Sequence, residues 1–490
     1  MKLMMRISAL YAAGVIAAVA ISLSGCGDKE STIPITTSSE KAREAYVKGR
    51  EYSENLRFTE ARNYFQQAIE ADSEFAMAYL SLAQTQTTTN EFYAAFNQAR
   101  ARVNRVSDGE RLMIEAVEAG IGGETQLQEQ LLTELTELYP LDKRAHMALG
   151  NFLFGQQLYQ RAIAEYRKIK ALDPNFAPPY NQAGYSFRAL EKYKEAEEAF
   201  KTYIRLIPDD PNPYDSYAEL LMKIGEFAES IDSYRRALNL DSSFAASYFG
   251  IASNLVYLGK YDSARQVLEV LYNRATDSGI KRNALAVTGF AYSDEGLLDK
   301  TVEQFEKMLA IGEQAGDSGS VSNDLILLAL VHTARQDWNA AIDCLNRQLV
   351  ATEHSNLDEA AKKNLRRVNL SGRTALAIAK GDLTEGKQLA DEYFAAVEKI
   401  GTRLQLMNGH SLYGRLATAE EKWDEAVKQF EQSSLQNVGN IYRLAVAYQG
   451  ANNLERAKTF ANKSAHWNQP LTLNYSLVRK KALKLERELE

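Results

Sequence analysis

The sequence is poor in the side chains that most catalytic and metal-binding sites require. It contains five histidines and two cysteines in 490 residues. The HExxH, CxxC, GxSxG and P-loop patterns do not occur in it. We therefore predict no catalytic residue, no metal ligand and no cofactor, and we expect that the protein is not an enzyme.

A strong excess of positive charge is also missing. The formal net charge is -7, and it becomes -9 once Lys2 and Arg6 are lost with the N-terminal leader described below. An acidic chain without a basic stripe lacks the electrostatic footprint of nucleic-acid binding. We therefore expect no nucleic-acid partner.

Cysteine and proline are both scarce, and their positions limit the architecture. If Cys26 is acylated, Cys344 has no partner for an intramolecular disulfide, and its place inside a helical segment favours buried packing over a reactive thiol. The nine prolines all avoid helix interiors. Pro178 stands in the first turn of an expected helix, and Pro208 follows the end of another. This distribution is compatible with a chain that is helical almost throughout.

The first 26 residues have the pattern of an export signal. Lys2 and Arg6 precede an apolar run from Ile7 to Leu23, and Leu23-Ser24-Gly25-Cys26 ends it. This pattern resembles a bacterial lipoprotein signal peptide, residues 1–25, whose lipobox makes Cys26 the acylated N-terminal residue. The resemblance implies a palmitate-bearing membrane anchor and a periplasm-facing position in the bacterial cell envelope. An uncleaved membrane helix is the alternative, although the run of 17 residues is at the short limit for spanning a bilayer.

Residues 26–41 are expected to form a flexible polar tether, because they are mostly small and polar and contain one proline. Asp28 resembles the signal that retains some enterobacterial lipoproteins in the inner membrane. Other phyla do not follow that rule, so the inner and the outer membrane both stay open as locations.

A 34-residue period organises most of the remaining chain. Small, aromatic and proline positions recur in one order, first as Gly150, Tyr159, Ala162, Tyr166 and Pro174, and then as Gly184, Tyr193, Ala196, Phe200 and Pro208. Within each unit the apolar residues recur every three or four positions, which is typical of two amphipathic helices. Gly184 and Ala196 are small where two helix backbones must pass closely. One helix pair cannot bury such a face alone, so neighbouring pairs must stack.

This pattern resembles the tetratricopeptide repeat (TPR) family. The resemblance implies an all-α fold, a right-handed α-solenoid of about eleven TPR helix pairs with a C-terminal capping helix. More loosely, Phe75–Leu82, Ser107–Ala119 and Asp173–Ile251 resemble the TPR tails of bacterial adenylate cyclases and protein kinases. That second resemblance implies a sensor or regulatory ancestry.

The quality of the repeats divides the chain into regions. We expect N-terminal TPRs with a degenerate third repeat at 42–142, four regular TPRs at 143–278, irregular TPRs at 279–470 and the capping helix at 471–490. In the irregular region, a Gly/Ser insertion is expected near 316–320 and a longer charged connection before Leu383. Gly120-Ile121-Gly122-Gly123 is expected to be a turn between helices, because no strand pattern precedes it.

The first helix of each repeat is expected to line a concave surface, where partners bind in the TPR family. The family's groove positions fall on twelve residues of the regular repeats, namely Met147, Asn151, Phe154, Asn181, Tyr185, Arg188, Asp215, Glu219, Met222, Phe249, Ser253 and Val256. Their aromatic rings offer contact area and their asparagines can satisfy a peptide backbone. Met147 stands where the first lysine of a carboxylate clamp would be, so recognition of a C-terminal carboxylate is not expected.

The leading hypothesis is a lipid-anchored cell-envelope TPR scaffold that binds proteins or peptides through its concave surface. The alternative is a regulatory or sensor subunit of a membrane-associated signalling complex. Tyr185 and Phe249 are expected to lie outside the packed core. Removal of one repeat, residues 211–244, is expected to leave a shorter fold, because stability adds repeat by repeat in such arrays.

Overall fold

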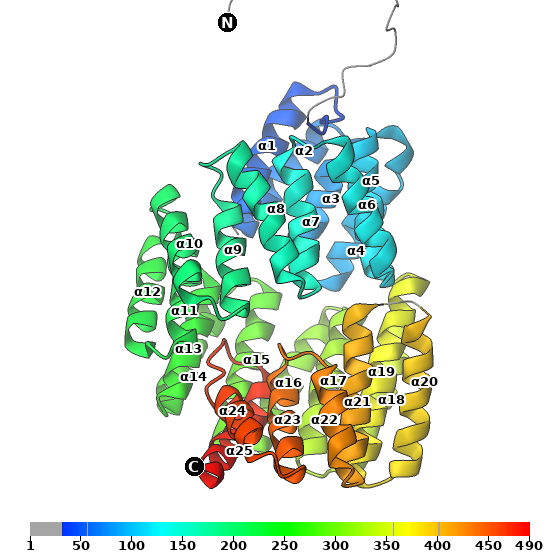
Figure 1. Cartoon of the computed structure of the whole chain (residues 1–490). Coiled ribbons are helices and arrows are strands. Elements are labelled where there is room, and N and C mark those ends of the chain that lie inside the picture. Colours follow the sequence, from blue (N-terminus) through cyan, green and yellow to red (C-terminus); the bar gives the residue numbers. More distant parts are fainter. Residues whose placement is uncertain (1–31, 56, 356, 400–401) are drawn as a thin grey trace, which may run out of the picture.

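The chain folds into a continuous array of paired helices. The computed structural model describes residues 32–55, 57–355, 357–399 and 402–490. All regular structure in these residues is helical, with twenty-five α-helices and one 3-10 helix, η1 (Val103–Arg105). The α-helices form twelve successive pairs and one final helix, where the sequence suggested about eleven pairs (Figure 1).

The first six pairs cover the N-terminal half of the chain. They are α1 (Glu40–Glu54) with α2 (Phe58–Ala71), α3 (Ala76–Gln84) with α4 (Thr89–Arg100), α5 (Asp108–Gly122) with α6 (Thr125–Leu138), α7 (Lys143–Gly155) with α8 (Tyr159–Leu172), α9 (Pro178–Ala189) with α10 (Tyr193–Leu206), and α11 (Pro211–Lys223) with α12 (Phe227–Leu240).

The other six pairs complete the array. They are α13 (Ala245–Tyr257) with α14 (Tyr261–Arg274), α15 (Ser278–Glu295) with α16 (Leu298–Gln314), α17 (Ser318–Ala334) with α18 (Trp338–Glu353), α19 (Glu359–Lys380) with α20 (Leu383–Glu398), α21 (Arg403–Ala419) with α22 (Trp423–Glu431), and α23 (Val438–Gly450) with α24 (Leu454–Ala465). The final helix is α25 (Leu473–Leu489).

A glycine–aromatic contact holds the two helices of a pair close together. A Cβ atom placed on Gly184 would lie 2.6 Å from the ring of Phe200, which is buried. The same contact recurs at Gly49–Phe65, Gly150–Tyr166, Gly289–Phe305 and Gly414–Phe430. The glycine at this position therefore leaves room for a ring from the second helix, as the repeat pattern predicts.

A second recurring contact ties the first helix of a regular pair to the chain that precedes it. The hydroxyls of Tyr180, Tyr214 and Tyr248 donate to the carbonyls of Pro174, Pro208 and Ser242, respectively. In the pair before these, Nε2 of His146 lies 2.9 Å from the carbonyl oxygen of Pro140. His146 thus replaces the tyrosine in a structural contact.

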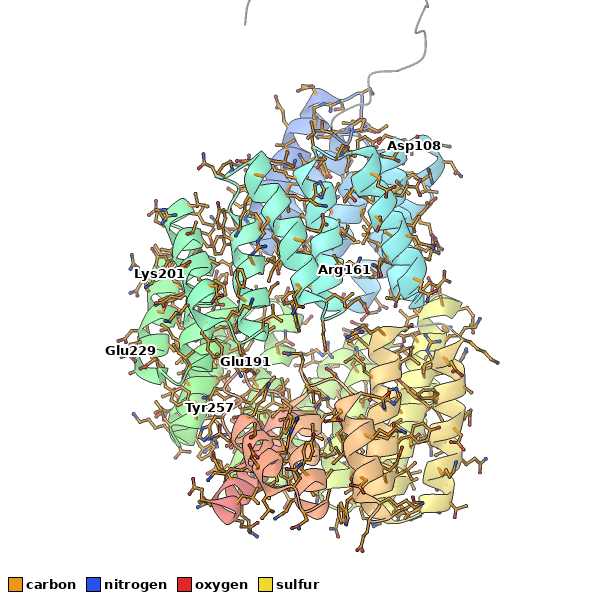
Figure 2. The ribbon with its side chains drawn as sticks, in the orientation of Figure 1. Asp108, Arg161, Glu191, Lys201, Glu229 and Tyr257 are labelled. Carbon is orange, nitrogen blue, oxygen red and sulfur yellow. The ribbon has the colours of Figure 1, made fainter. Side chains whose placement is uncertain are left out.

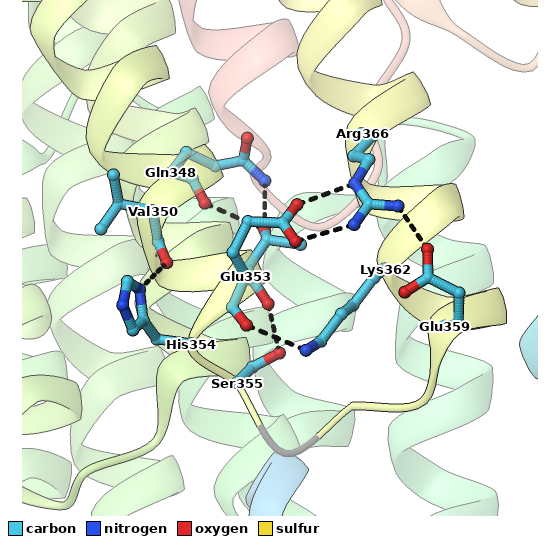
Figure 3. Close-up of polar contacts among 9 residues, drawn as sticks. Gln348, Val350, Glu353, His354, Ser355, Glu359, Lys362 and Arg366 are labelled. Carbon is cyan, nitrogen blue, oxygen red and sulfur yellow. Dashed lines mark hydrogen bonds and ion pairs between the residues drawn. The ribbon is translucent and has the colours of Figure 1, made fainter.

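The long charged connection predicted before Leu383 is wrong. That stretch contains α19, which at 22 residues is a full first helix of a pair. Arg366 on α19 binds both carboxylate oxygens of Glu353 at 2.7 Å and one of Glu359 at 2.6 Å, and Lys362 donates to the Glu353 carbonyl at 2.9 Å (Figure 3). The charges that suggested a loop therefore join the start of α19 to the end of α18.

The array winds back onto itself after seven pairs. α4 packs on α17 and α5 packs on α19, so pair two meets pair nine and pair three meets pair ten (Figure 1). The Thr89 N–H donates to Oδ2 of Asp317 at 3.1 Å, and Thr402 Oγ1 donates to the Gly123 carbonyl at 2.8 Å. Asp317 also caps α17. The predicted Gly/Ser insertion at 316–320 is therefore the start of a helix and part of this seam.

Candidate functional site

The first helices line the inner face of the winding array. First helices of successive pairs contact one another, for example α11 with α13 and α19 with α21. The second helices lie outside them, and the exposed Lys201 on α10 and Glu229 on α12 mark the outer edge (Figure 2). Partner-binding residues of the inner face must therefore come from odd-numbered helices, as the groove assignment assumed.

An open cavity of about 720 Å³ lies on the inner face between α1 and the start of α9. Three of the twelve predicted groove residues line it, namely Met147, Asn151 and Asn181. Asn151 is exposed and lines the cavity; its Oδ1 accepts a hydrogen bond from Tyr166 at 3.1 Å, and no described residue accepts from its amide N–H groups. Oδ1 of the buried Asn181 also has no hydrogen-bond partner among the described residues. The exposed Asn151 amide can therefore donate to a peptide backbone, whereas the Asn181 oxygen is inaccessible to solvent.

The N-terminal segment of the described chain forms part of the wall of this cavity. The N–H of Ile33 donates to Oδ2 of Asp142 at 2.8 Å, and the N–H of Thr36 donates to Oε1 of Glu110 at 2.9 Å. Asp142 caps α7 with its other oxygen, and Glu110 completes the capping box of α5. Each carboxylate therefore accepts hydrogen bonds both from a helix N-terminus and from the backbone of the N-terminal segment.

Residues 32–39 are consequently not a flexible tether, and that part of the prediction is wrong. The side chain of Ile33 reaches Gly109 and Tyr139, and Ile35 packs against the first core cluster. The composition looked like a linker because it is polar, but two isoleucines bury apolar surface and two carboxylates accept the backbone N–H groups. The tether prediction for 26–31 lies outside the described residues.

Four predicted groove residues form a network instead of a free surface. The Tyr185 hydroxyl lies 3.2 Å from both Ser216 Oγ and Glu219 Oε1, and Arg188 donates to Glu219 Oε2 at 2.7 Å. Asp215 is buried and accepts from Ser247 Oγ at 2.7 Å. Burial, and then the nearby Glu219 charge, raises the pKa of Asp215 to about 8.

Tyr185 therefore belongs to the packing between helix pairs, and its assignment outside the core is wrong. Its ring makes an edge-to-face contact with Phe200 at 5.2 Å, and the Arg188 guanidinium lies 4.7 Å from the centre of the Tyr185 ring. Phe154, another predicted groove residue, is half-buried and packs edge-on against Tyr159 at 5.4 Å. The repeat frame identifies the helix face of such residues but not what the next helix places against them.

The remaining four groove residues are covered by the C-terminal end of the chain. Met222, Ser253 and Val256 are buried, and Phe249 is half-buried. Met222 and Val256 share one apolar cluster with Trp467, Leu471, Tyr475 and Val478, and Phe249 packs against that cluster. The expectation that these four line an open groove is wrong.

Polar contacts fix the covering segment in place. Lys223 donates to the Trp467 carbonyl at 2.7 Å, and the Leu471 N–H donates to Ser253 Oγ at 3.0 Å. Arg479 on α25 donates to Asp294 at 2.9 Å. Its guanidinium lies over the ring of Tyr257, which is labelled in Figure 2. The predicted helix at 471–490 exists as α25, but it fills the inner face between α15 and α23 and packs on α24 in addition to ending the array.

His146 and Cys344, two side chains of types used in catalysis and metal binding, lie in packed surroundings. Nδ1 of His146 lies 2.7 Å from Glu165, and this contact raises the pKa of His146. Burial raises the pKa of the Cys344 thiol to about 11. Within the described ranges, no group of three or more His, Cys, Asp and Glu side chains is arranged to hold a metal ion.

The membrane prediction falls on the other end of the chain. Cys26 and the signal peptide lie outside the described residues. Among the helices that are described, none combines the length and the apolar character needed to cross a bilayer.

Comparisons with known proteins point to one family. Residues 46–106 and 129–175 match one tetratricopeptide repeat model, and residues 177–210 and 212–244 match another. The BBSome complex member BBS4 homolog of Drosophila melanogaster is 22% identical over 256 residues, which cover 51% of this chain and 52% of that protein. Hsp70-Hsp90 organizing protein 2 of Arabidopsis thaliana is 22% identical over 209 residues, which cover 38% of this chain and 36% of that protein.

The matched region thus spans about half of the first relative and about a third of the second. Among solved structures, the APC/C hetero-tetramer Cut9-Hcn1 aligns with 93% of this chain and 79% of that chain, at 14% identity and a TM-score of 0.40.

Proposed function

Because this chain is a tetratricopeptide repeat protein, we propose that it is a non-catalytic scaffold that binds an extended segment of a partner protein in the cavity between α1 and α9. The name of the Hsp70-Hsp90 organizing relative is consistent with protein partners. The observation that carries the proposal is the chain's own segment at 32–37, which has no regular secondary structure, forms part of the cavity wall and has two backbone N–H groups bound by Asp142 and Glu110. Polar side chains that bind the backbone of one irregular segment are of the kind that would bind the backbone of a second segment beside it.

The chemistry of the rest of the cavity fits the same ligand. Met147 offers apolar surface, while Asn151 and Gln182 offer amides. Amides can donate to peptide carbonyls and accept from peptide N–H groups, so they bind a backbone with little regard to sequence. The covered face between α11 and α15 is not part of this site.

Asn151 provides the test of the groove. Asn151→Asp keeps an oxygen that accepts from Tyr166 but removes the N–H groups that would donate to a peptide carbonyl. Losing a buried hydrogen bond and facing a carbonyl with a carboxylate costs about 1.5–3 kcal/mol, so partner recovered by co-purification from solubilised membranes should fall about tenfold or more.

The matched control is Asn239→Asp, the same change at an exposed position on α12. It should leave partner recovery unchanged, and both variants should keep the parent melting temperature within a few degrees. Equal recovery from Asn151→Asp and the parent would place partner binding elsewhere. A small molecule recovered in the cavity would favour the sensor role instead of the scaffold role.

The proposal includes an anchor at Cys26, which would hold the scaffold at the bacterial cell envelope. The support is the lipobox-like Leu23-Ser24-Gly25-Cys26 after an apolar run. Cys26→Ser should abolish metabolic labelling with palmitate and leave an unprocessed precursor, because the thiol is the acylation site. Label retained by the variant would contradict the anchor, and an unlabelled parent that stays in the membrane fraction would favour an uncleaved helix.

A further inference from the structure

Two arginines lie on the neighbouring first helices of the last two helix pairs, α21 and α23, far along the chain from the N-terminal cavity. Arg415 follows Gly414 on α21 as Tyr185 follows Gly184 on α9, so it occupies an inner-face position. Arg443 lies on the neighbouring first helix, α23. The two helices are joined by a buried hydrogen bond from Ser411 Oγ to Asn440 Oδ1 at 2.7 Å. Arg415 comes one turn after Ser411, and Arg443 nearly one turn after Asn440, so both side chains leave from the joined faces.

Neither arginine has an anionic partner. The ion pairs and hydrogen bonds of the described residues include none to Arg415 or Arg443, although both side chains are half-buried. Nε of Arg415 is inaccessible to solvent and unpaired. Three other interior arginines of this chain are neutralised: Arg188 pairs with Glu219, Arg282 with Asp324, and Arg479 with Asp294, at 2.6–2.9 Å.

The missing counter-charge is electrostatically costly in the free protein. Burial lowers the pKa of Arg415 to about 10, and burial together with the Arg415 charge lowers the pKa of Arg443. Both shifts have the sign expected for cations that have lost water without gaining a carboxylate. A bound oxyanion would replace the lost hydration and offset the repulsion between the two guanidinium groups.

The first turn of α23 completes the arrangement. A Cβ atom on Gly439 would lie 2.9 Å from Nη1 of Arg443, so the guanidinium lies beside the first turn of the helix at a residue with no side chain. The amino end of a helix carries partial positive charge and adds to the field of the two arginines. Because glycine has no side chain, the guanidinium of Arg443 can approach the helix backbone closely at this point.

We propose that Arg415 and Arg443 bind a doubly charged oxyanion, either inorganic phosphate or the phosphate group of a larger ligand. Guanidinium groups match phosphate oxygens with two parallel N–H donors, and two of them can neutralise two negative charges. The site differs from the peptide-binding cavity in its helices and in its ligand.

The test is thermal unfolding of the full chain, and isothermal titration calorimetry, with inorganic phosphate at constant ionic strength. We expect phosphate to raise the melting temperature of the parent by several degrees and to leave that of Arg443→Met unchanged. Without phosphate, Arg443→Met should melt at or above the parent temperature, because the change removes an unpaired interior charge. Arg443→Lys, which keeps the charge but lacks the planar fork, should bind phosphate at least tenfold more weakly.

Arg235→Met, at an exposed position on α12, is the matched control and should respond to phosphate like the parent. Titration with O-phosphoserine distinguishes the two sources of the group, since tighter binding than inorganic phosphate would indicate a larger phosphorylated ligand. An equal phosphate shift in the parent and Arg443→Met, or no shift in the parent with either ligand, would overturn the proposal.

Discussion

Truncation of the chain after Ala465 is expected to lower its free energy of unfolding by on the order of 10 kcal/mol. The removed segment contains Trp467, Leu471, Leu473, Tyr475 and Val478, each at most 7% exposed. Burial of one such side chain contributes about 2 kcal/mol, and the loss also uncovers the inner faces of α11, α13 and α15. Since whole domains are stable by only about 5–15 kcal/mol, urea denaturation followed by circular dichroism should show early unfolding of the second half.

Two point variants make the same test without truncation. Tyr475→Ala removes a buried ring and the hydrogen bond from its hydroxyl to the Ala465 carbonyl, and it should cost about 3–5 kcal/mol. Lys484→Ala on the exposed side of α25 should change stability by less than about 0.5 kcal/mol. A truncated chain with the parent urea midpoint would mean that the segment is a dispensable cover over a usable groove.

Deletion of residues 211–244 is expected to disrupt the fold rather than shorten it. Removing one pair would bring pair two against pair ten, whereas the seam is built between pair two and pair nine. It would also remove Met222 and Lys223, which hold Trp467. With the seam and the C-terminal segment both displaced, we expect a loss of roughly 5 kcal/mol or more, seen as a broad, non-cooperative unfolding transition.

Thr89→Pro tests the seam without a deletion. Thr89 is the first residue of α4, and Thr88 before it is extended, so proline fits the helix start. The change removes the N–H that donates to Asp317 and should cost about 1–2 kcal/mol. A deletion variant that unfolds cooperatively with a proportionate loss of helix would restore the view that the repeats add independently.

Local packing followed from the sequence because the repeat encodes it in residue types. Gly184 is small because Phe200 lies against it, and the tyrosines and His146 at the next recurring position bind a carbonyl in each regular pair. Such contacts lie within 34 residues or between neighbouring units. They are therefore visible as a period, and the period identified the family and the fold class.

Contacts between distant units leave no period and were missed. The Thr89–Asp317 seam depends on small rotations that accumulate over seven pairs. α19 lacks the repeat signature, and its charged start resembles a linker until the Glu353–Arg366 contact is seen. The two terminal segments occur once each and are not part of the repeat. The sequence pattern therefore could not indicate that Ile33 and Trp467 pack against the inner face. The unpaired Arg415 and Arg443 could have been found only by knowing which carboxylates lie nearby.

The hydrogen bonds that attach Ile33 and Thr36 to the solenoid would limit its distance from a bilayer that holds a lipid on Cys26. Six peptide steps separate Cys26 from Thr32, and a fully extended chain spans at most about 3.6 Å per residue, or roughly 20 Å here. A lipid on Cys26 would therefore keep the rim formed by the starts of α5 and α7 close to the headgroups. The folded array could not move far from the bilayer surface. A partner chain would therefore have to enter the cavity from the side, parallel to the membrane plane.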